Sequence, residues 1–157
     1  MTLLAEYQEA RREEDIVRVR RVLALRALGA TGLSQREIAE AVGVSQPAIS
    51  QQLKNAPDLD DVHPEALIEA AGPVLVAVAK QFGYSRLAVF GSVARGKAQH
   101  DSDIDLLVQS PPKASSFDFL RFKQLLEDVL GRDIDLIDYR GLKPTIDDDI
   151  KREAMLL

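Results

Sequence analysis

A glycine–serine pair and two aspartates stand at a spacing that suits phosphate chemistry. Gly91 and Ser92 follow the apolar segment 86–90, and Asp103 and Asp105 open a second apolar segment. Side chains alternate along a strand, so the two aspartates are expected on the same face. Adjacent carboxylates repel each other unless a cation neutralises them, and paired hard oxygens suit Mg²⁺ together with substrate phosphates. The pattern predicts a site for Mg²⁺ and a nucleoside triphosphate.

Each half of this pattern also has a simpler interpretation. A Gly-Ser pair alone is usually a turn, and an Asp-x-Asp on an edge strand is often a solvated face. However, Ile104 and the apolar residues 106–108 indicate a buried strand, where an acid pair is costly without a purpose. The combination therefore favours a functional site.

The residues around both halves resemble a known signature. Residues 91–96 are Gly-Ser-Val-Ala-Arg-Gly, and residues 102–108 are Ser-Asp-Ile-Asp-Leu-Leu-Val, with ten residues between Ser92 and Asp103. This resembles the minimal nucleotidyltransferase (MNT) family of the DNA polymerase beta-like superfamily. The resemblance covers roughly residues 65–157. It implies a third carboxylate on a neighbouring strand, and Asp135 stands at the matching position.

The resemblance also implies a role for each of these residues. Three carboxylates would be catalytic and would hold two Mg²⁺ ions: Asp103, Asp105 and Asp135. The triphosphate of the substrate ATP would be bound by Gly91, Ser92 and Arg95. For Arg95, a salt bridge to a nearby acid is an equally good interpretation.

A second motif lies near the N-terminus. Residues 34–50 resemble the helix-turn-helix of Cro/repressor-type regulators, with a capping box at Ser34 and Glu37 and a turn at Gly43. The apolar contact between the two short helices is expected from Ile38, Ala39, Val42, Val44, Ile49 and Leu53. The third helix would present to DNA Ser45, Gln46, Ala48, Ser50, Gln51 and Gln52. The alternative is an ordinary three-helix bundle with a polar surface.

Basic residues near this motif could contact DNA phosphates: Arg11, Arg12, Arg18, Arg20, Arg21, Arg26, Arg36 and Lys54. Residues 1–56 carry eight Lys/Arg and seven Asp/Glu, whereas residues 57–157 carry twelve and eighteen. The net charges of +1 and −6 suggest two modules with different partners. Segment 3–12 is a candidate contact for a homodimer.

Composition limits the remaining classes. The 157 residues contain no cysteine and two histidines, which excludes disulfides, thiolate metal sites and a histidine cluster. No apolar run is long enough to cross a membrane, and the N-terminus does not read as a signal peptide, so a cytoplasmic protein is expected.

Periodicity and turn residues predict an α+β protein. An all-α helix-turn-helix domain (1–56) and a linker (57–63) would precede a nucleotidyltransferase domain (64–157) with a mixed sheet backed by helices. Helices are expected over 3–28 (one or two), 34–42, 45–53, 64–82, 116–130 and 146–156. Strands are expected over 86–90, 103–108 and 133–137. Gly72-Pro73 should kink or split the fourth of these helices.

The resemblance further implies a partner protein. Larger relatives that modify small molecules carry an added helical domain to hold the substrate, and no such segment is present here. The expected acceptor is therefore a toxin of the HEPN class, which an antitoxin of this family adenylylates, with operator DNA bound for autoregulation. Two alternatives stay open: a regulator whose nucleotidyltransferase-like domain only senses a nucleotide, and a free-standing enzyme acting on a small molecule.

Overall fold

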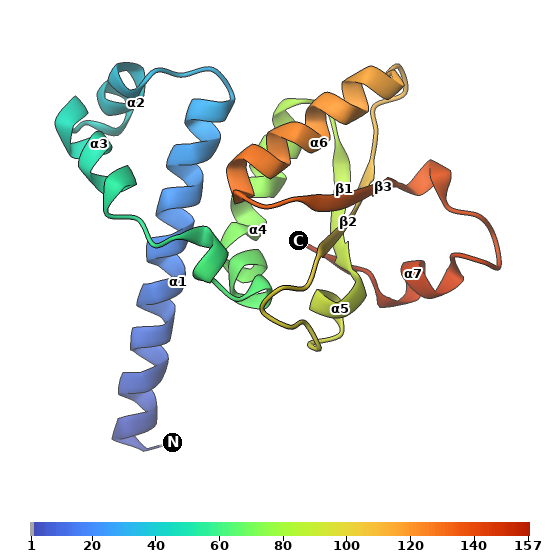
Figure 1. Ribbon diagram of the computed structural model, residues 1–157, viewed down its shortest axis with the longest axis horizontal. Helices are drawn as coiled ribbons and strands as arrows, with labels where there is room; N and C mark the ends of the chain where they lie inside the picture. The colour runs from blue at the N-terminus through green and yellow to red at the C-terminus, as the bar shows by residue number, and fades with distance from the viewer. Residues whose placement is uncertain (1) are drawn as a thin grey trace.

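The computed structural model describes residues 2–157 and contains a four-stranded sheet flanked by helices (Figure 1). The strands are β1 (Ser85–Phe90), β2 (Ile104–Gln109), β3 (Ile134–Asp138) and β4 (Met155–Leu156). Their order is β3-β2-β1-β4. β1 is antiparallel to β2 and β4, whereas β2 and β3 are parallel. The expected α+β class and mixed sheet are confirmed.

Two helices cover one face of the sheet: α4 (Pro64–Gln81) and α6 (Ser116–Leu130) (Figure 1). Ile104, Leu106 and Val108 alternate along β2 and are fully buried in this core, beside Leu126 of α6. Burying one such side chain stabilises the fold by about 1.5–3 kcal/mol. α4 is continuous through Gly72 and Pro73, so the expected split is absent.

The opposite face of the sheet is only partly covered. A small buried cluster there contains Ala88, Phe90, Leu107 and Leu142, and Ile150 of the short helix α7 (Asp148–Glu153) packs against it. Side chains alternate along β2, so the residues between those that face the main core, including Asp105, belong to this opposite face. The fold therefore leaves part of this face open to polar groups.

The end of the described chain differs from the prediction of a helix over 146–156. α7 ends at Glu153, Ala154 has extended backbone angles, and Met155 and Leu156 form β4. In β4 they pair with Val89 and Ala88 of β1. A helix this short is marginal on its own, and hydrogen bonds to the free edge of β1 favour the strand instead.

The N-terminal unit consists of α1 (Leu3–Ala30), α2 (Gln35–Val42) and α3 (Gln46–Lys54). The capping box at Ser34 and Glu37 is present, and Gly43 ends α2 with a φ of 82°. Leu25, Ile38, Ala39 and Ile49 are the buried residues that join the three helices. Val42 and Val44, predicted to join this contact, are instead 51% and 40% exposed. Val42 is the last residue of α2 and Val44 follows its C-cap, so both come after the buried residues Ile38 and Ala39.

Helix α1 also contacts the sheet domain. Leu23 and Ala27 belong to the main core with α4 and α6, while Leu25 belongs to the N-terminal cluster. Within the sheet domain, α5 (Gly91–Ala94) follows β1 directly, and the 3-10 turn η2 (Tyr139–Gly141) follows β3. The 3-10 turn η1 (Leu59–Asp61) lies between the two units. Leu59, inside the predicted linker, is buried in the main core. The domain boundary at residue 56 stays a prediction.

None of the helices among residues 2–157 combines the length and the apolar character that crossing a membrane requires.

Candidate active site

Asp105 and Asp135 lie side by side on the open face of the sheet. In the parallel pairing of β2 with β3, Asp105 is the register partner of Asp135. Burial, hydrogen bonding to Asp135 and the negative charges of Asp135 and Asp103 raise the pKa of Asp105 to about 6. Neighbouring carboxylates repel each other unless a cation neutralises them. The pair is therefore an acid site that a cation could occupy.

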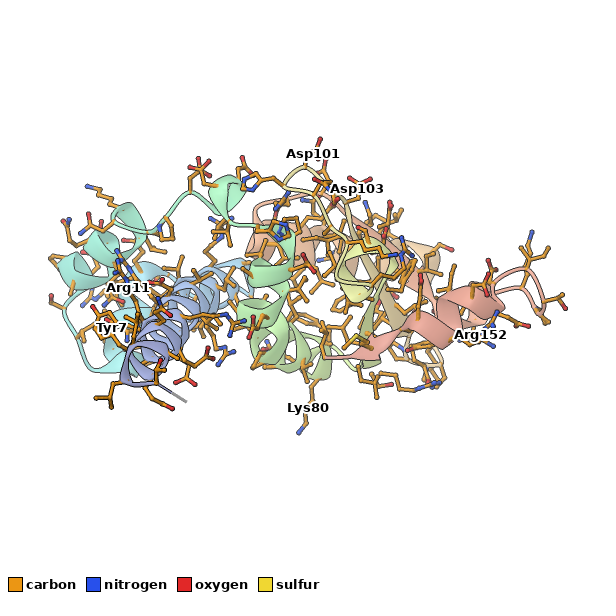
Figure 2. All side chains as sticks on the ribbon, turned by 90° about the horizontal axis from the view of Figure 1, so that it is seen from below. Tyr7, Arg11, Lys80, Asp101, Asp103 and Arg152 are labelled. Atoms are coloured by element: carbon orange, nitrogen blue, oxygen red, sulfur yellow. The ribbon has the colours of Figure 1, made fainter. Side chains whose placement is uncertain are left out.

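Asp103 lies at the edge of this pair. It precedes β2 by one residue and is exposed, and its charge contributes to the raised pKa of Asp105. Figure 2 shows Asp101 and Asp103 at the same edge of the protein. No group of three acids or histidines within residues 2–157 is arranged as a ready ligand set for a metal ion. The assignment of all three aspartates to metal binding stays a prediction.

The donor set nevertheless suits a divalent cation. The carboxylates of Asp105 and Asp135 are hard oxygen ligands, and Mg²⁺ commonly binds through one or two carboxylates plus substrate phosphates. The negative charges of Asp135 and Asp103 raise the pKa of Asp105, and a bound cation would offset this repulsion. Mg²⁺ would be held by Asp105 and Asp135, with Asp103 next to them.

Gly91 brings the backbone of the Gly-Ser turn against Asp105. Its φ is +72°, and a Cβ added there would overlap the Asp105 carboxylate and lie 3.0 Å from the Asp105 Cγ atom. Any other residue would be strained by the left-handed backbone and would collide with the acid. The turn therefore requires glycine at position 91, because the backbone there passes directly against the acid.

A residue that sequence reasoning missed binds the same turn. The Glu153 carboxylate, on α7, accepts hydrogen bonds from the Gly91 N–H (3.0 Å) and from Arg95 Nη1 (2.9 Å). The hydrogen bond from Arg95 lowers the pKa of Glu153, and the bond from Gly91 acts in the same direction. The salt-bridge interpretation of Arg95 is thus present in the structure. Nothing local in the sequence marks Glu153, because its contacts are made 58 and 62 residues away.

The structure places the predicted DNA-contact residues on α3 or at its start. Gln46 and Gln51 are exposed, Gln52, Ala48 and Ser50 are partly buried, and the Ser45 hydroxyl caps the helix. Ala48, Gln51 and Gln52 border a shallow pocket that Arg18 and Arg21 of α1 also line. DNA contact by these residues stays a prediction.

Three of the arginines proposed for phosphate contact are engaged elsewhere. Arg20 Nε donates to the Ala70 carbonyl, and Arg26 Nε donates to the Val129 carbonyl, each at 2.9 Å. Arg12 forms an ion pair with Glu69. All three therefore tie α1 to the sheet domain, which leaves Arg18 and Arg21 as the basic residues of α1 beside α3.

A mixed sheet that sets a Gly-Ser turn beside aspartates on two neighbouring strands defines a nucleotidyltransferase domain. Residues 77–157 match the model of the family described as polymerase beta, nucleotidyltransferase, and the chain belongs to this family.

Individual relatives agree with this assignment. The chain is 36% identical over 81 residues to MJ0435 of Methanocaldococcus jannaschii, a candidate protein adenylyltransferase; the match covers 52% of this chain and 87% of MJ0435. It is 37% identical over 76 residues to the protein adenylyltransferase MntA of Thermococcus cleftensis, covering 48% of this chain and 77% of MntA. The solved structure of a candidate minimal nucleotidyltransferase superposes with a TM-score of 0.53 at 36% identity, covering 66% of this chain and 99% of that one.

Proposed function

We propose that this nucleotidyltransferase is a protein adenylyltransferase, which transfers AMP from ATP to a hydroxyl group of a partner protein. The observation that carries the proposal is the Asp105–Asp135 pair directly beside the Gly91 turn. The names of MntA and MJ0435 support the same activity. A partner protein is the preferred acceptor because both relatives are named as protein adenylyltransferases.

The proposed reaction is a substitution at the α-phosphorus of ATP. The acceptor oxygen forms a bond to the α-phosphorus, and the bond from that phosphorus to the bridging oxygen of the β-phosphate breaks. The products are the AMP ester and pyrophosphate, and the hydroxyl proton is released to an acidic side chain or to water. Such a reaction depends on positioning and charge neutralisation more than on covalent help from the protein.

The residues of the chain would divide this work. Arg95 and the Ser92 turn would orient the triphosphate. Asp103, Asp105 and Asp135 would hold Mg²⁺ at one edge of the sheet, and one of these carboxylates would accept the proton of the acceptor hydroxyl. Mg²⁺, when bound by the aspartates, would supply positive charge to the phosphate oxygens. The Gly91 N–H bonds to Glu153 in this structure, so its proposed contribution to the site is the placing of Ser92 rather than a phosphate contact of its own.

The proposed acceptor is a tyrosine of a HEPN-class toxin, which would make this protein the antitoxin of the pair. The test combines labelled ATP, Mg²⁺, this protein and the product of the neighbouring gene, and reads the intact mass of both proteins. We expect one added AMP on the partner, and none when Asp103→Asn replaces the wild type. If nucleotide binds but no partner or small molecule is modified, the domain is a nucleotide sensor and the transferase proposal is wrong.

We also propose that the N-terminal unit binds operator DNA through α3. The support is the exposure of Gln46 and Gln51 on α3 and the position of Arg18 and Arg21 beside that helix. Gln46→Ala or Gln51→Ala should each weaken binding to the cognate promoter by about 1–3 kcal/mol. Arg18→Ala should weaken binding to every sequence and reduce its salt dependence. The measurement is a salt-dependent binding titration of the full chain, and equal affinity for promoter and random DNA would refute the regulator role.

A further inference from the structure

Glu153 reaches the Gly-Ser turn from a distant part of the chain. Its carboxylate bonds both the Gly91 N–H and Arg95 Nη1, and its side chain is only 24% exposed. Charge-assisted hydrogen bonds of this kind are about twice as strong as neutral ones. The Glu153 carboxylate therefore holds two groups that were predicted to bind the triphosphate: the Gly91 N–H and the Arg95 guanidinium.

Two explanations of this contact make opposite predictions. Glu153 could occupy the position of a substrate phosphate and block it, or it could hold the turn in the shape that receives the phosphate. The chain around Glu153 favours the second. Glu153 ends α7, and β4 begins two residues later, paired with the same strand β1 that leads into Gly91. The fold therefore keeps the backbone of Glu153 beside the turn, as expected for a residue that supports the turn in every state.

The surroundings of Arg95 favour the second explanation as well. Arg95 and the Gly91 N–H share the Glu153 carboxylate, and the Gly91 backbone lies directly against Asp105, so the guanidinium is held next to the turn that borders the acid pair. Without Glu153, the guanidinium would lose this anchor and would be free to move toward the acid pair. Arg95 would then compete with a metal ion for the carboxylates. A guanidinium has five N–H donors, so the bond to Glu153 leaves donors available for a phosphate.

We infer that Glu153 is a positioning residue, which anchors the Gly91 N–H and holds Arg95 toward the Gly-Ser turn and away from the Asp105–Asp135 pair. Gly91 is thereby fixed from two sides, by the Asp105 carboxylate and by Glu153. The expected consequence is that Glu153 controls the affinity for nucleotide and metal more than the rate at saturation. This inference rests on the proposed nucleotide transfer.

The test compares Glu153→Gln and Glu153→Ala with the wild type. Glutamine keeps an oxygen acceptor for Gly91 but loses the ion pair, whereas alanine loses both contacts. The apparent KM for ATP and the half-saturating Mg²⁺ concentration should rise about tenfold in the alanine variant and less in the glutamine variant, as expected for the loss of a charge-assisted bond. The value of kcat at saturation should change by less than about threefold, which corresponds to an effect on binding rather than on chemistry.

Asp149→Asn is the matched control on the same helix, because Asp149 pairs only with the exposed Arg152. It should leave both constants unchanged. Amide hydrogen exchange supplies a readout that needs no ligand: the Gly91 N–H should be protected in the wild type and in Asp149→Asn, and should lose protection in Glu153→Ala. If the alanine variant does not fold, the glutamine variant, which has nearly the same volume, carries the test.

The outcomes distinguish a failure of the positioning role of Glu153 from a failure of the proposed nucleotide transfer. Tighter ATP binding by Glu153→Ala would mean that Glu153 competes with phosphate, and unchanged constants in both variants would mean that it has no role in the site; either result overturns the inference. If the wild type neither binds nor transfers nucleotide, the proposed function fails first, and the positioning role fails with it. Loss of Gly91 protection together with raised KM values, at an unchanged melting temperature, supports the inference.

Discussion

The two faces of the sheet differ in what covers them, although the same strands build both. On one face, Ile104, Leu106 and Val108 are buried under α4 and α6. On the other, Asp105 alternates with these residues and lies beside Asp135, under a much smaller apolar cluster. A strand with period-two alternation can therefore contribute stability with one set of residues and carry like charges with the next.

This difference explains how the protein can keep an acid pair that opposes folding. Like charges on adjacent strands destabilise a sheet, and partial burial adds to that cost. The covered face offsets it, because the main core continues into α1, α4 and α6. Substitutions on the two faces should therefore separate activity from stability, and the following predictions test that separation.

The largest expected effect is on activity, from Asp105→Asn. Loss of one charge at the acid pair should lower nucleotide transfer by about a thousandfold, since charge neutralisation at a metal site contributes several kcal/mol to a barrier. The melting temperature of the metal-free protein should stay the same or rise, because the like-charge repulsion with Asp135 is removed. Transfer assays and thermal unfolding measure the two effects. A large fall in both would mean that Asp105 is chiefly structural.

Leu106→Ala should produce the opposite result. Leu106 is fully buried in the main core, so its truncation should cost about 2–5 kcal/mol of unfolding free energy. Nucleotide transfer below the unfolding temperature should be retained. Leu107→Ala is the paired variant: it is equally buried but belongs to the smaller cluster on the acid face, and should cost less. Denaturant titrations measure the loss of unfolding free energy in both variants. A larger loss for Leu107→Ala than for Leu106→Ala would show that the covered face does not supply most of the stability.

Gly91→Ala tests the contact between the turn and the acid face. The left-handed φ of Gly91 should cost alanine about 1–2 kcal/mol, and the new methyl group would overlap the Asp105 carboxylate. Combined with Asp105→Ala, which removes that carboxylate, the second part of the cost should disappear. A double-mutant cycle of unfolding free energies measures the coupling, expected at about 0.5–3 kcal/mol. Additive costs would show that the turn and the acid do not touch.

The smallest expected effect is a dependence of stability on pH. The folded-state pKa of Asp105 is raised to about 6 from 3.8, so the folded state holds its proton more tightly than the unfolded state does. This contribution to stability is complete below about pH 4 and is lost as the pH rises through about 6. In Asp105→Asn the melting temperature should lose this slope, and Mg²⁺ should reduce it in the wild type. An unchanged slope in the variant would place the titrating group elsewhere.

The sequence allowed the strands of the acid site to be predicted for a physical reason. β1, β2 and β3 each carry a local alternation or apolar run, which predicts the strands. Asp135 was expected from the family resemblance, and its pairing with Asp105 is set by the parallel register that the structure shows. The helix boundaries at Ser34 and Gly43 follow from capping and turn residues, which act over a few positions.

The rest of the site depends on contacts that no local pattern encodes. β4 is two residues long, and its existence depends on the free edge of β1. Glu153 lies on a helix with no buried residue of its own, so neither periodicity nor a motif distinguishes it from its exposed neighbours. The exposure of Val42 was missed because a helical stripe in the sequence does not show how far the partner helix extends.

Helix α1 has a geometric consequence for a protein with two proposed binding surfaces. One side of α1 contacts α2 and α3, and the opposite side contacts α4 and α6, so a continuous helix rather than a flexible linker joins the two units (Figure 1). The hydrogen bonds of Arg20 and Arg26 to backbone carbonyls fix the orientation of α1 on α4 and α6. The Gly-Ser turn and α3 would then keep a fixed distance and orientation relative to each other. A large partner bound at the turn could therefore contact or block DNA bound on α3 without any change in the shape of the protein.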